Sequence, residues 1–198
     1  HWIQTSSKTN WFPTAEEIEK EIKSIKNDNL LLFLNSPNNP SGTVCKNLKE
    51  IAEVSRKNKI VILSDEIYSN LTFEEKYKSI SNFYPEGTIV STGLSKWCGA
   101  GGWRLGFFAI PDELEELKNS LKILCSESFT SVSAPIQYAA VEAYIGDYSE
   151  YLNRVKKILL SVGMHAYENL KSNAINVSKP EGGFYLFPEF INAKFSSS

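Results

Sequence analysis

Short apolar runs alternate along the chain with longer stretches in which apolar residues recur at helical spacing. Wholly apolar runs of strand length are typical of a parallel sheet that helices cover on both faces. We predict strands at residues 30–34, 59–63, 88–91 and 105–110. We predict helices at about residues 48–58, 112–124, 134–145 and 148–170. Thr14, with Glu17 after it, matches a capping box and indicates one more helix start. This alternation favours an α/β fold with a mainly parallel sheet flanked by helices.

The organisation changes after Pro111, where helices predominate. The helix predicted at 148–170 is long enough to link or brace two domains. Two short strands are predicted beyond it, at residues 175–178 and 183–187. We interpret these strands as the beginning of a small α+β domain. The predicted domains are therefore residues 1–146 and residues 147–198, with the linking helix counted in the second.

Composition narrows the class of protein. The chain is 42% hydrophobic and 22% charged, with a formal net charge of -2, which is ordinary for a globular domain. This charge provides no basic patch for nucleic acid or for an anionic membrane surface. No apolar run approaches the roughly 20 residues that span a bilayer. Cys45, Cys98 and Cys125 are scattered and form no CxxC pair, so we expect no metal site, no disulfide and a reducing, cytoplasmic location.

Polar residues follow three of the predicted strands, where open parallel sheets bind their ligands. They are Asn38 and Asn39 after the first strand, Asp65 and Tyr68 after the second, and Ser95 and Lys96 after the third. Each has a structural explanation of its own, such as turn chemistry for Asn39, a cap for Asp65 or a solvated loop for Lys96. Because all of them fall at one end of the predicted sheet, a ligand site is the better interpretation.

A glycine-rich loop, GLSKWCGAGGWRLG, occupies residues 93–106 and contains Lys96 and Arg104. A lysine amine forms an imine with an aldehyde. A guanidinium grips a phosphate through paired hydrogen bonds, and Ser95 adds a hydroxyl. These are two of the tasks that pyridoxal phosphate requires of a protein. A dinucleotide site is rejected, because Arg104 stands where G-x-G-x-x-G needs its last glycine.

The pyridine ring of the same cofactor requires other groups. A carboxylate at Asp65 would keep the ring nitrogen protonated, which makes the ring an electron sink. Tyr68 and Asn39 would hydrogen-bond the phenolate oxygen. The residues themselves thus predict pyridoxal 5'-phosphate as the cofactor.

The glycine-rich loop resembles the lysine-attachment segment of class I and II aminotransferases, which have the aspartate aminotransferase fold, fold type I of the pyridoxal phosphate enzymes. SPNNPSG at 36–42 resembles the family's N-P-[ST]-G turn, and SDEIY at 64–68 its D-x-x-Y segment. GGFYLF at 182–187 resembles its entry strand into the small domain. The resemblance covers about residues 13–190. It implies a homodimer that acts on an amino acid and a 2-oxo acid.

The resemblance assigns the cofactor contacts to Asn39, Asp65, Tyr68, Ser95, Lys96 and Arg104. Lys96 is the implied catalytic residue, which binds the cofactor as a Schiff base and moves the proton between the substrate Cα and the cofactor C4′. Asp65 would pair with the pyridinium nitrogen. The family's Asn–Pro bond is usually cis, so we expect Asn39–Pro40 to be cis.

The sequence departs from the family pattern at both ends and at one internal position. The family's phosphate-binding Ser/Gly loop and ring-stacking aromatic residue normally precede the matched region. The arginine that grips the substrate α-carboxylate normally follows it, yet no arginine follows Arg154. We therefore expect a fragment: the C-terminal part of the large domain with the beginning of the small one. Gly93 stands where some members carry a phosphate-binding serine, so one phosphate contact is expected to be missing.

Three functions remain open. The first is a transaminase that exchanges an amino group by a ping-pong reaction, with aspartate or a related common amino acid as the default donor. The second keeps the cofactor in a C–S β-lyase or an enzyme similar to aminocyclopropane-carboxylate synthase. The third is a non-catalytic aminotransferase-like module for dimerisation or ligand sensing.

Overall fold

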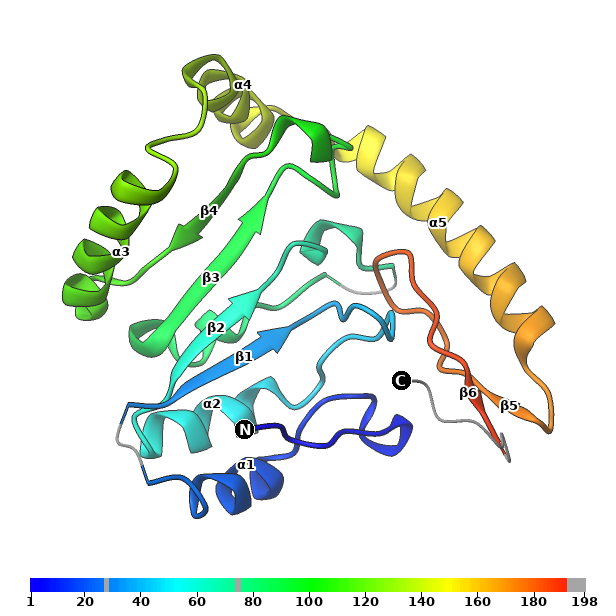
Figure 1. Ribbon diagram of the computed structural model, residues 1–198. Helices are drawn as coiled ribbons and strands as arrows, with labels where there is room; N and C mark the ends of the chain where they lie inside the picture. The colour runs from blue at the N-terminus through cyan, green and yellow to red at the C-terminus, as the bar shows by residue number, and fades with distance from the viewer. Residues whose placement is uncertain (27–28, 74–75, 192–198) are drawn as a thin grey trace.

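A four-stranded sheet is the central feature of the computed structural model, which describes residues 1–26, 29–73 and 76–191 (Figure 1). In order across the sheet, the strands are β1 (Leu31–Asn35), β2 (Val61–Asp65), β3 (Thr88–Gly93) and β4 (Gly106–Ala109). The first three strands are parallel, and β4 is antiparallel to β3. The predicted α/β fold with a mainly parallel sheet is confirmed.

The helices surround the sheet on several sides (Figure 1). Their bounds are α1 (Ala15–Ile22), α2 (Leu48–Lys57), α3 (Glu115–Ser128), α4 (Ala134–Ile145) and α5 (Ser149–Leu170). α1 and α2 lie together on one side, α3 and α4 lie beyond β4, and α5 runs past the carboxyl ends of the strands. Among the helices of the described ranges, none has the length and apolar character needed to cross a membrane.

A two-stranded antiparallel sheet of β5 (Ile175–Asn176) and β6 (Glu189–Phe190) follows α5. The strand predicted at 183–187 is wrong. Gly183 has a φ of 68°, which a strand does not adopt, and its N–H donates to the carbonyl of Leu71 instead. The predicted domain boundary falls between α4 and α5 and stays a prediction. The second predicted domain includes residues 192–198, which lie outside the described part of the chain.

The predicted capping box begins α1. The Thr14 hydroxyl accepts a hydrogen bond from the Glu17 N–H at 3.2 Å, and the Glu17 carboxylate accepts one from the Thr14 N–H at 2.8 Å. This pairing satisfies two backbone N–H groups that the helix start leaves free. α1 then packs with α2 against one face of the sheet, and Ile18, Ile51 and Ile62 are buried between them.

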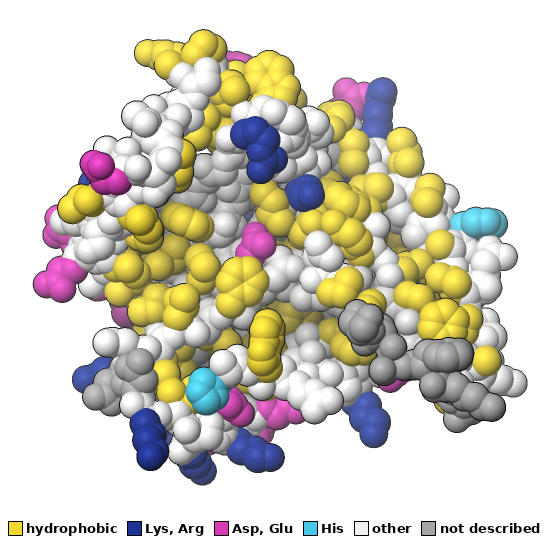
Figure 2. Space-filling model, viewed as in Figure 1, with side chains coloured by type: hydrophobic (Ala, Val, Ile, Leu, Met, Phe, Trp, Pro, Cys, Tyr) yellow, Lys and Arg dark blue, Asp and Glu magenta, His cyan; other side chains and the backbone are white. Residues whose placement is uncertain are grey.

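The opposite face of the sheet is largely bare at β1. Leu34 is 3% exposed on the covered face, whereas Leu31 and Phe33 are 61% and 62% exposed on the other. Side chains alternate between the two faces of a strand, so β1 has buried side chains on one face and exposed side chains on the other. Figure 2 shows hydrophobic side chains gathered over the sheet on this side. The prediction that helices cover both faces is therefore wrong for this part of the described sheet.

Glu181 fastens the segment before β6 to two distant parts of the chain. Its Oε2 accepts hydrogen bonds from the Val44 N–H at 2.7 Å and from Asn10 Nδ2 at 3.0 Å. Its Oε1 lies 3.3 Å from Lys46 Nζ. A hydrogen bond to a charged group contributes about 1.5–3 kcal/mol. These bonds hold the segment 181–185 against the loop that follows β1.

Gly93 ends β3 opposite the start of β4. It pairs with Gly106, and a Cβ at Gly93 would lie 2.6 Å from the carbonyl oxygen of Leu105. At that distance the backbone of Leu105 would have to shift to admit any side chain. The strand pairing of this chain therefore favours the glycine found here over a phosphate-binding serine.

We predict that Gly93→Ala lowers the free energy of unfolding by about 1–3 kcal/mol, the usual cost of overpacking. The backbone of Leu105 has to shift to admit the new methyl group. Urea denaturation followed by circular dichroism measures the change. Gly102→Ala is the matched control, because no heavy atom lies within 4 Å of a Cβ built there. Its stability should stay within about 0.5 kcal/mol of the wild type. Equal stabilities of the two variants would contradict this account.

Candidate functional site

The carboxyl ends of the parallel strands bring the predicted site residues to one edge of the sheet. Asn35 at the end of β1 pairs in register with Asp65 at the end of β2, and Asp65 pairs with Ser91 of β3. The loops that leave these strands carry Asn39 and Lys96. Residues that are far apart in the sequence therefore become neighbours because the strands are parallel and in register.

Two adjoining cavities contain all the residues that the sequence assigned to the cofactor. The first, of about 780 Å³, is lined by Asn39, Asp65, Tyr68 and Lys96 among other residues. The second, of about 260 Å³, is lined by Ser95 and Arg104 and again by Asp65. The structure thus brings these side chains together around Asp65. Their chemical roles stay predictions.

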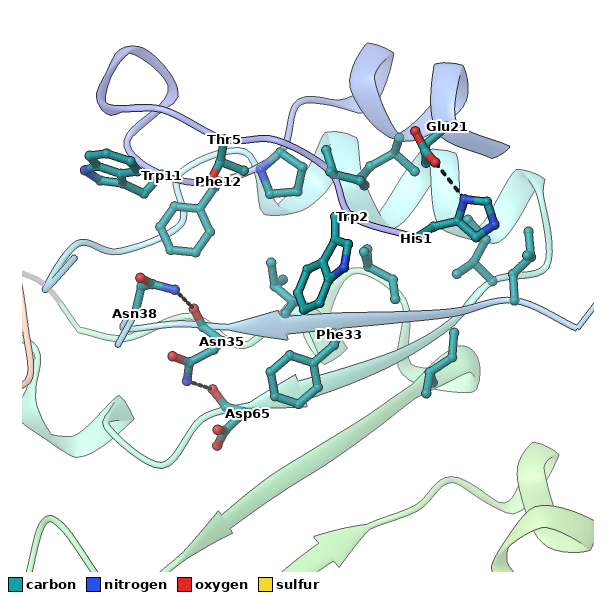
Figure 3. Close-up of a pocket in the computed structure, with 18 of the residues that line it drawn as sticks. His1, Trp2, Thr5, Trp11, Phe12, Glu21, Phe33, Asn35, Asn38 and Asp65 are labelled. Atoms are coloured by element: carbon teal, nitrogen blue, oxygen red, sulfur yellow. Dashed lines mark hydrogen bonds and ion pairs between the residues drawn. The ribbon is translucent and has the colours of Figure 1, made fainter. Parts of the chain in front are cut away.

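Asn35 and Asn38 hold the first loop in place, and sequence reasoning gave neither a role. The Asn35 side chain donates to the Asp65 carbonyl at 3.1 Å and accepts from the Asn39 N–H at 2.7 Å. Asn38 Nδ2 donates to the Asn35 carbonyl at 3.3 Å (Figure 3). The Asn39–Pro40 peptide bond is cis as predicted, and so is Ser36–Pro37, which was not predicted. This network directs Asn39 toward the cavity that Asp65 lines.

Asp65 is a half-buried carboxylate with unused hydrogen-bonding capacity. Its Oδ1 accepts from the Ile67 N–H at 3.3 Å, which is a long bond. Burial raises the pKa of Asp65, and the Ile67 N–H and the charge of Lys96 offset only part of that rise. A cation or a positively charged N–H in the cavity would lower the pKa again and stabilise the carboxylate.

The neighbouring carboxylate of Glu66 lies on the other side of the backbone. It is 6% exposed and accepts hydrogen bonds from Ser64 Oγ at 2.9 Å and Ser79 Oγ at 2.5 Å. Burial raises its pKa, and these hydroxyls oppose the rise. Of the two adjacent acidic residues, only Asp65 lines a cavity at the end of the sheet. Glu66 instead anchors the segment that contains Ser79.

Tyr68 and two aromatic residues from the far end of the chain form a wall beside Lys96. The Tyr68 hydroxyl lies 2.9 Å from the Tyr185 hydroxyl, and Asn39 is a further hydrogen-bond partner. Lys96 Nζ lies 5.7 Å from the ring centre of Tyr68 and 5.8 Å from that of Phe184, within the range of cation–π attraction. Sequence reasoning missed Phe184 and Tyr185, although the two glycines before them indicate a close backbone approach.

The loop that carries Lys96 is anchored on both sides of the lysine. The Leu94 and Trp97 side chains are 4% exposed and belong to a second core cluster. Arg104 has a left-handed backbone with a φ of 56°, and its Nη1 donates to the Gly101 carbonyl at 2.8 Å. Arg104 as a residue is exposed. Its remaining N–H groups are available to an anion in the second cavity.

This set of donors and acceptors fits pyridoxal phosphate. Asp65 matches a protonated ring nitrogen, and Tyr68 with Asn39 matches the phenolate oxygen. Lys96 supplies a primary amine in the same cavity. Ser95 and Arg104 match a phosphate in the adjoining one. No three His, Cys, Asp or Glu residues of the described ranges are grouped so as to hold a metal ion.

Comparison with known proteins agrees with the geometry. Residues 2–197 match the sequence profile of the family described as aminotransferase class I and II. The chain is 32% identical over 178 residues to a probable aspartate aminotransferase of Methanocaldococcus jannaschii. The matched region covers 87% of this chain and 47% of that protein. It is 32% identical over 209 residues to an asparagine–oxo-acid transaminase of Streptococcus mutans, covering 97% of this chain and 49% of that one.

Solved structures give the same result. An alanine aminotransferase from Pyrococcus furiosus matches with a TM-score of 0.85 and 31% identity, covering 96% of this chain and 49% of that chain. An aromatic aminotransferase from Pyrococcus horikoshii matches with a TM-score of 0.82 and 28% identity, covering 94% and 50%. The chain spans about half the length of the relatives it matches.

We predict that Asp65→Asn makes the ligand-free chain melt a few degrees higher than the wild type at neutral pH. The folded-state pKa of Asp65 lies above its ordinary value of 3.8. The folded chain therefore binds this proton more tightly than the unfolded chain, and the ionised carboxylate costs stability once the pH exceeds the folded-state pKa. The difference should shrink as the pH falls toward 3.8. Thermal unfolding measured across this pH range tests the sign.

Asp112→Asn is the control for this experiment, because the Asp112 carboxylate is 99% exposed and its 3.7 Å ion pair with Lys118 lies at the surface, where such pairs contribute little to stability. Its melting temperature should follow that of the wild type at each pH. A lower melting temperature for Asp65→Asn than for the wild type at neutral pH would show that the ionised, half-buried Asp65 carboxylate does not destabilise the folded chain.

Proposed function

Because the chain belongs to the class I and II aminotransferases, we propose that it carries the cofactor half of a pyridoxal-phosphate-dependent transaminase. The reaction is the exchange of an amino group between an amino acid and a 2-oxo acid. One observation carries the proposal: Asn39, Asp65, Tyr68 and Lys96 line a single cavity at the carboxyl end of a parallel sheet. Members of this family use pyridoxal phosphate.

Lys96 is the proposed catalytic residue. When bound, pyridoxal phosphate supplies an aldehyde that takes up an amino group and a ring that withdraws electrons from the substrate Cα. The Lys96 amine would bind the cofactor aldehyde and, when free, would move a proton between the substrate Cα and the cofactor C4′. Leu94 and Trp97 on either side are buried. Their packing holds the loop so that the lysine stays at the cavity while its amine moves between these tasks.

Asp65 and Tyr68 would hold the cofactor ring. The Asp65 carboxylate would accept a hydrogen bond from the ring nitrogen, whose positive charge would lower the raised carboxyl pKa. Burial raises the pKa of Tyr68, so its hydroxyl stays protonated and acts as a donor to the phenolate oxygen. The Asn39 side chain lies beside the same hydroxyl and supplies a further polar contact.

Ser95 and Arg104 bind the phosphate group. Both line the second cavity, which meets the first at Asp65 and Ile67. One guanidinium nitrogen is already held by Gly101, which fixes the direction of the others. With Gly93 in place of a serine, Arg104 and Ser95 carry more of this contact.

Aspartate is the default amino-group donor in this proposal. Relatives named aspartate aminotransferase support it. Others are named for asparagine, alanine or aromatic residues. The proposal is therefore made for amino acids as a class, with aspartate tested first.

We also propose a homodimer in the cytoplasm. Large apolar side chains of β4, α3 and α4 are exposed, as expected of surfaces that meet a second subunit. They include Phe107, Phe108, Leu124, Val141 and Ile145. Cys45, Cys98 and Cys125 are all free, which agrees with a reducing compartment.

We predict that pyridoxal phosphate becomes fixed on the Lys96 peptide when the wild-type chain is incubated with it and reduced with sodium borohydride. Peptide mass spectrometry detects the adduct. In Lys96→Ala the peptide that contains position 96 should carry no adduct, because the amine that attacks the aldehyde is gone. Lys122→Ala is the control, since Lys122 is an exposed lysine on α3, and it should label as the wild type does. Labelling of Lys96→Ala to the same extent as the wild type, or no adduct on the Lys96 peptide of the wild type, would contradict the assignment. The second result would favour the non-catalytic module.

A second experiment separates the transaminase from the lyase. Because this chain supplies only the cofactor half of the site, the experiment uses a full-length protein that contains it. We expect that protein to convert aspartate to its 2-oxo acid only when an acceptor 2-oxo acid is present, in a one-to-one ratio. Release of pyruvate and ammonia from cystathionine without an acceptor would instead identify the C–S lyase. A coupled dehydrogenase assay for each oxo acid distinguishes the outcomes, with Lys96→Ala as the blank.

A further inference from the structure

The Tyr68 hydroxyl is contacted from behind by a residue that does not line the cavity. Tyr185 Oη lies 2.9 Å from Tyr68 Oη, and the two rings meet edge to face with their centres 5.6 Å apart. Tyr68 and Asn39 line the first cavity, whereas Tyr185 lies outside its lining. Tyr185 therefore reaches a group at that cavity through Tyr68.

The backbone of Tyr185 is held firmly at this place. The Glu181 N–H donates to the Gly42 carbonyl at 2.8 Å, and the Gly183 N–H donates to the Leu71 carbonyl at 3.1 Å. A Cβ at Gly42 would lie 2.2 Å from the carbonyl oxygen of Tyr185. The two segments thus touch backbone to backbone, and Tyr185 has little freedom to withdraw from Tyr68.

The chemistry of a phenol gives this contact a direction. A tyrosine hydroxyl has one proton and two acceptor lone pairs. If Tyr68 gives its proton to an anionic oxygen in the cavity, its oxygen is left to accept, and the Tyr185 hydroxyl is placed to donate to it. Hydrogen bonds in such a chain polarise and strengthen one another. Without Tyr185, the Tyr68 oxygen accepts one hydrogen bond fewer. The Tyr68 hydroxyl is then a weaker donor to the anionic oxygen.

We propose that Tyr185 is a positioning residue whose hydroxyl donates to Tyr68 and so orients and strengthens the hydrogen bond that Tyr68 donates to the phenolate oxygen of the bound cofactor. The inference rests on the proposed function, because it requires the cofactor ring at the Tyr68 hydroxyl. It adds a residue from beyond α5 to a site that is otherwise built on the large sheet.

The test follows the visible absorbance of the bound cofactor as the pH is varied. A stronger donor to the phenolate oxygen stabilises the unprotonated form of the lysine–cofactor linkage. Loss of that donor raises the titration midpoint. We expect Tyr185→Phe to raise the midpoint by about 0.3 pH unit, the order expected when one bond of a cooperative chain is lost. Tyr68→Phe should raise it more.

A double-mutant cycle distinguishes positioning from packing. If Tyr185 acts through Tyr68, Tyr185→Phe should cause no further shift in the Tyr68→Phe background. Tyr138→Phe is the control, because Tyr138 is 79% exposed on α4, and it should leave the midpoint unchanged. Melting temperatures measured alongside show that each variant is folded, and Tyr185→Phe keeps the ring that packs on Tyr68.

The outcomes separate the two proposals. A wild type that titrates normally, with no shift in folded Tyr185→Phe or with equal shifts in both backgrounds, overturns the role of Tyr185 alone. A wild type that takes up no cofactor overturns the proposed function and this inference together. If Tyr185→Phe does not fold, Tyr185→Met, which cannot donate, is compared with Tyr185→His, whose ring N–H can donate to Tyr68. A higher midpoint for Tyr185→Met supports the role, and equal midpoints overturn it.

Discussion

The parallel register of β1, β2 and β3 is the constraint on which the site depends. Parallel strands end at the same edge, so the loops that leave them start side by side. Asn35, Asp65 and Ser91 form one row across the sheet, and a shift of one residue in β2 would turn Asp65 to the face that Ile62 occupies. The helices α1 and α2 support this register, because their apolar faces cover the side of the sheet on which Leu34 and Ile62 are buried.

Polar contacts then convert this edge into a site with defined directions. The Asn35 amide joins the first loop to β2, and the Glu66 carboxylate ties the end of β2 to a neighbouring segment. Neither residue needs to touch a ligand to matter. Each removes freedom from a residue that lines the cavity, so the cost of ordering Asn39 and Asp65 is met during folding rather than on binding.

Much of this arrangement is predictable from the sequence, because it is local. The capping box at Thr14, the apolar runs of the strands and the polar residues at their ends all depend on neighbours in the chain, and the structure confirms them. The contribution of Tyr185 is not local. Tyr185 and Tyr68 are 117 positions apart in the sequence. The hydrophobic pattern of neither segment predicts their contact. The exposed face of β1 was also missed, since Leu31 and Phe33 have the same apolar character as the buried Leu34.

The bonds of Glu181 have a consequence for the order in which the chain folds. Its carboxylate meets Asn10 across 171 positions and Val44 across 137. Contacts of such long sequence separation form slowly, because a large loop must close first. During synthesis, the sheet and its two packed helices precede Glu181 by many residues. The aromatic wall beside Lys96 therefore closes only after residue 185 has been synthesised, and a chain that ends before that residue would present the lysine with one side of its cavity open.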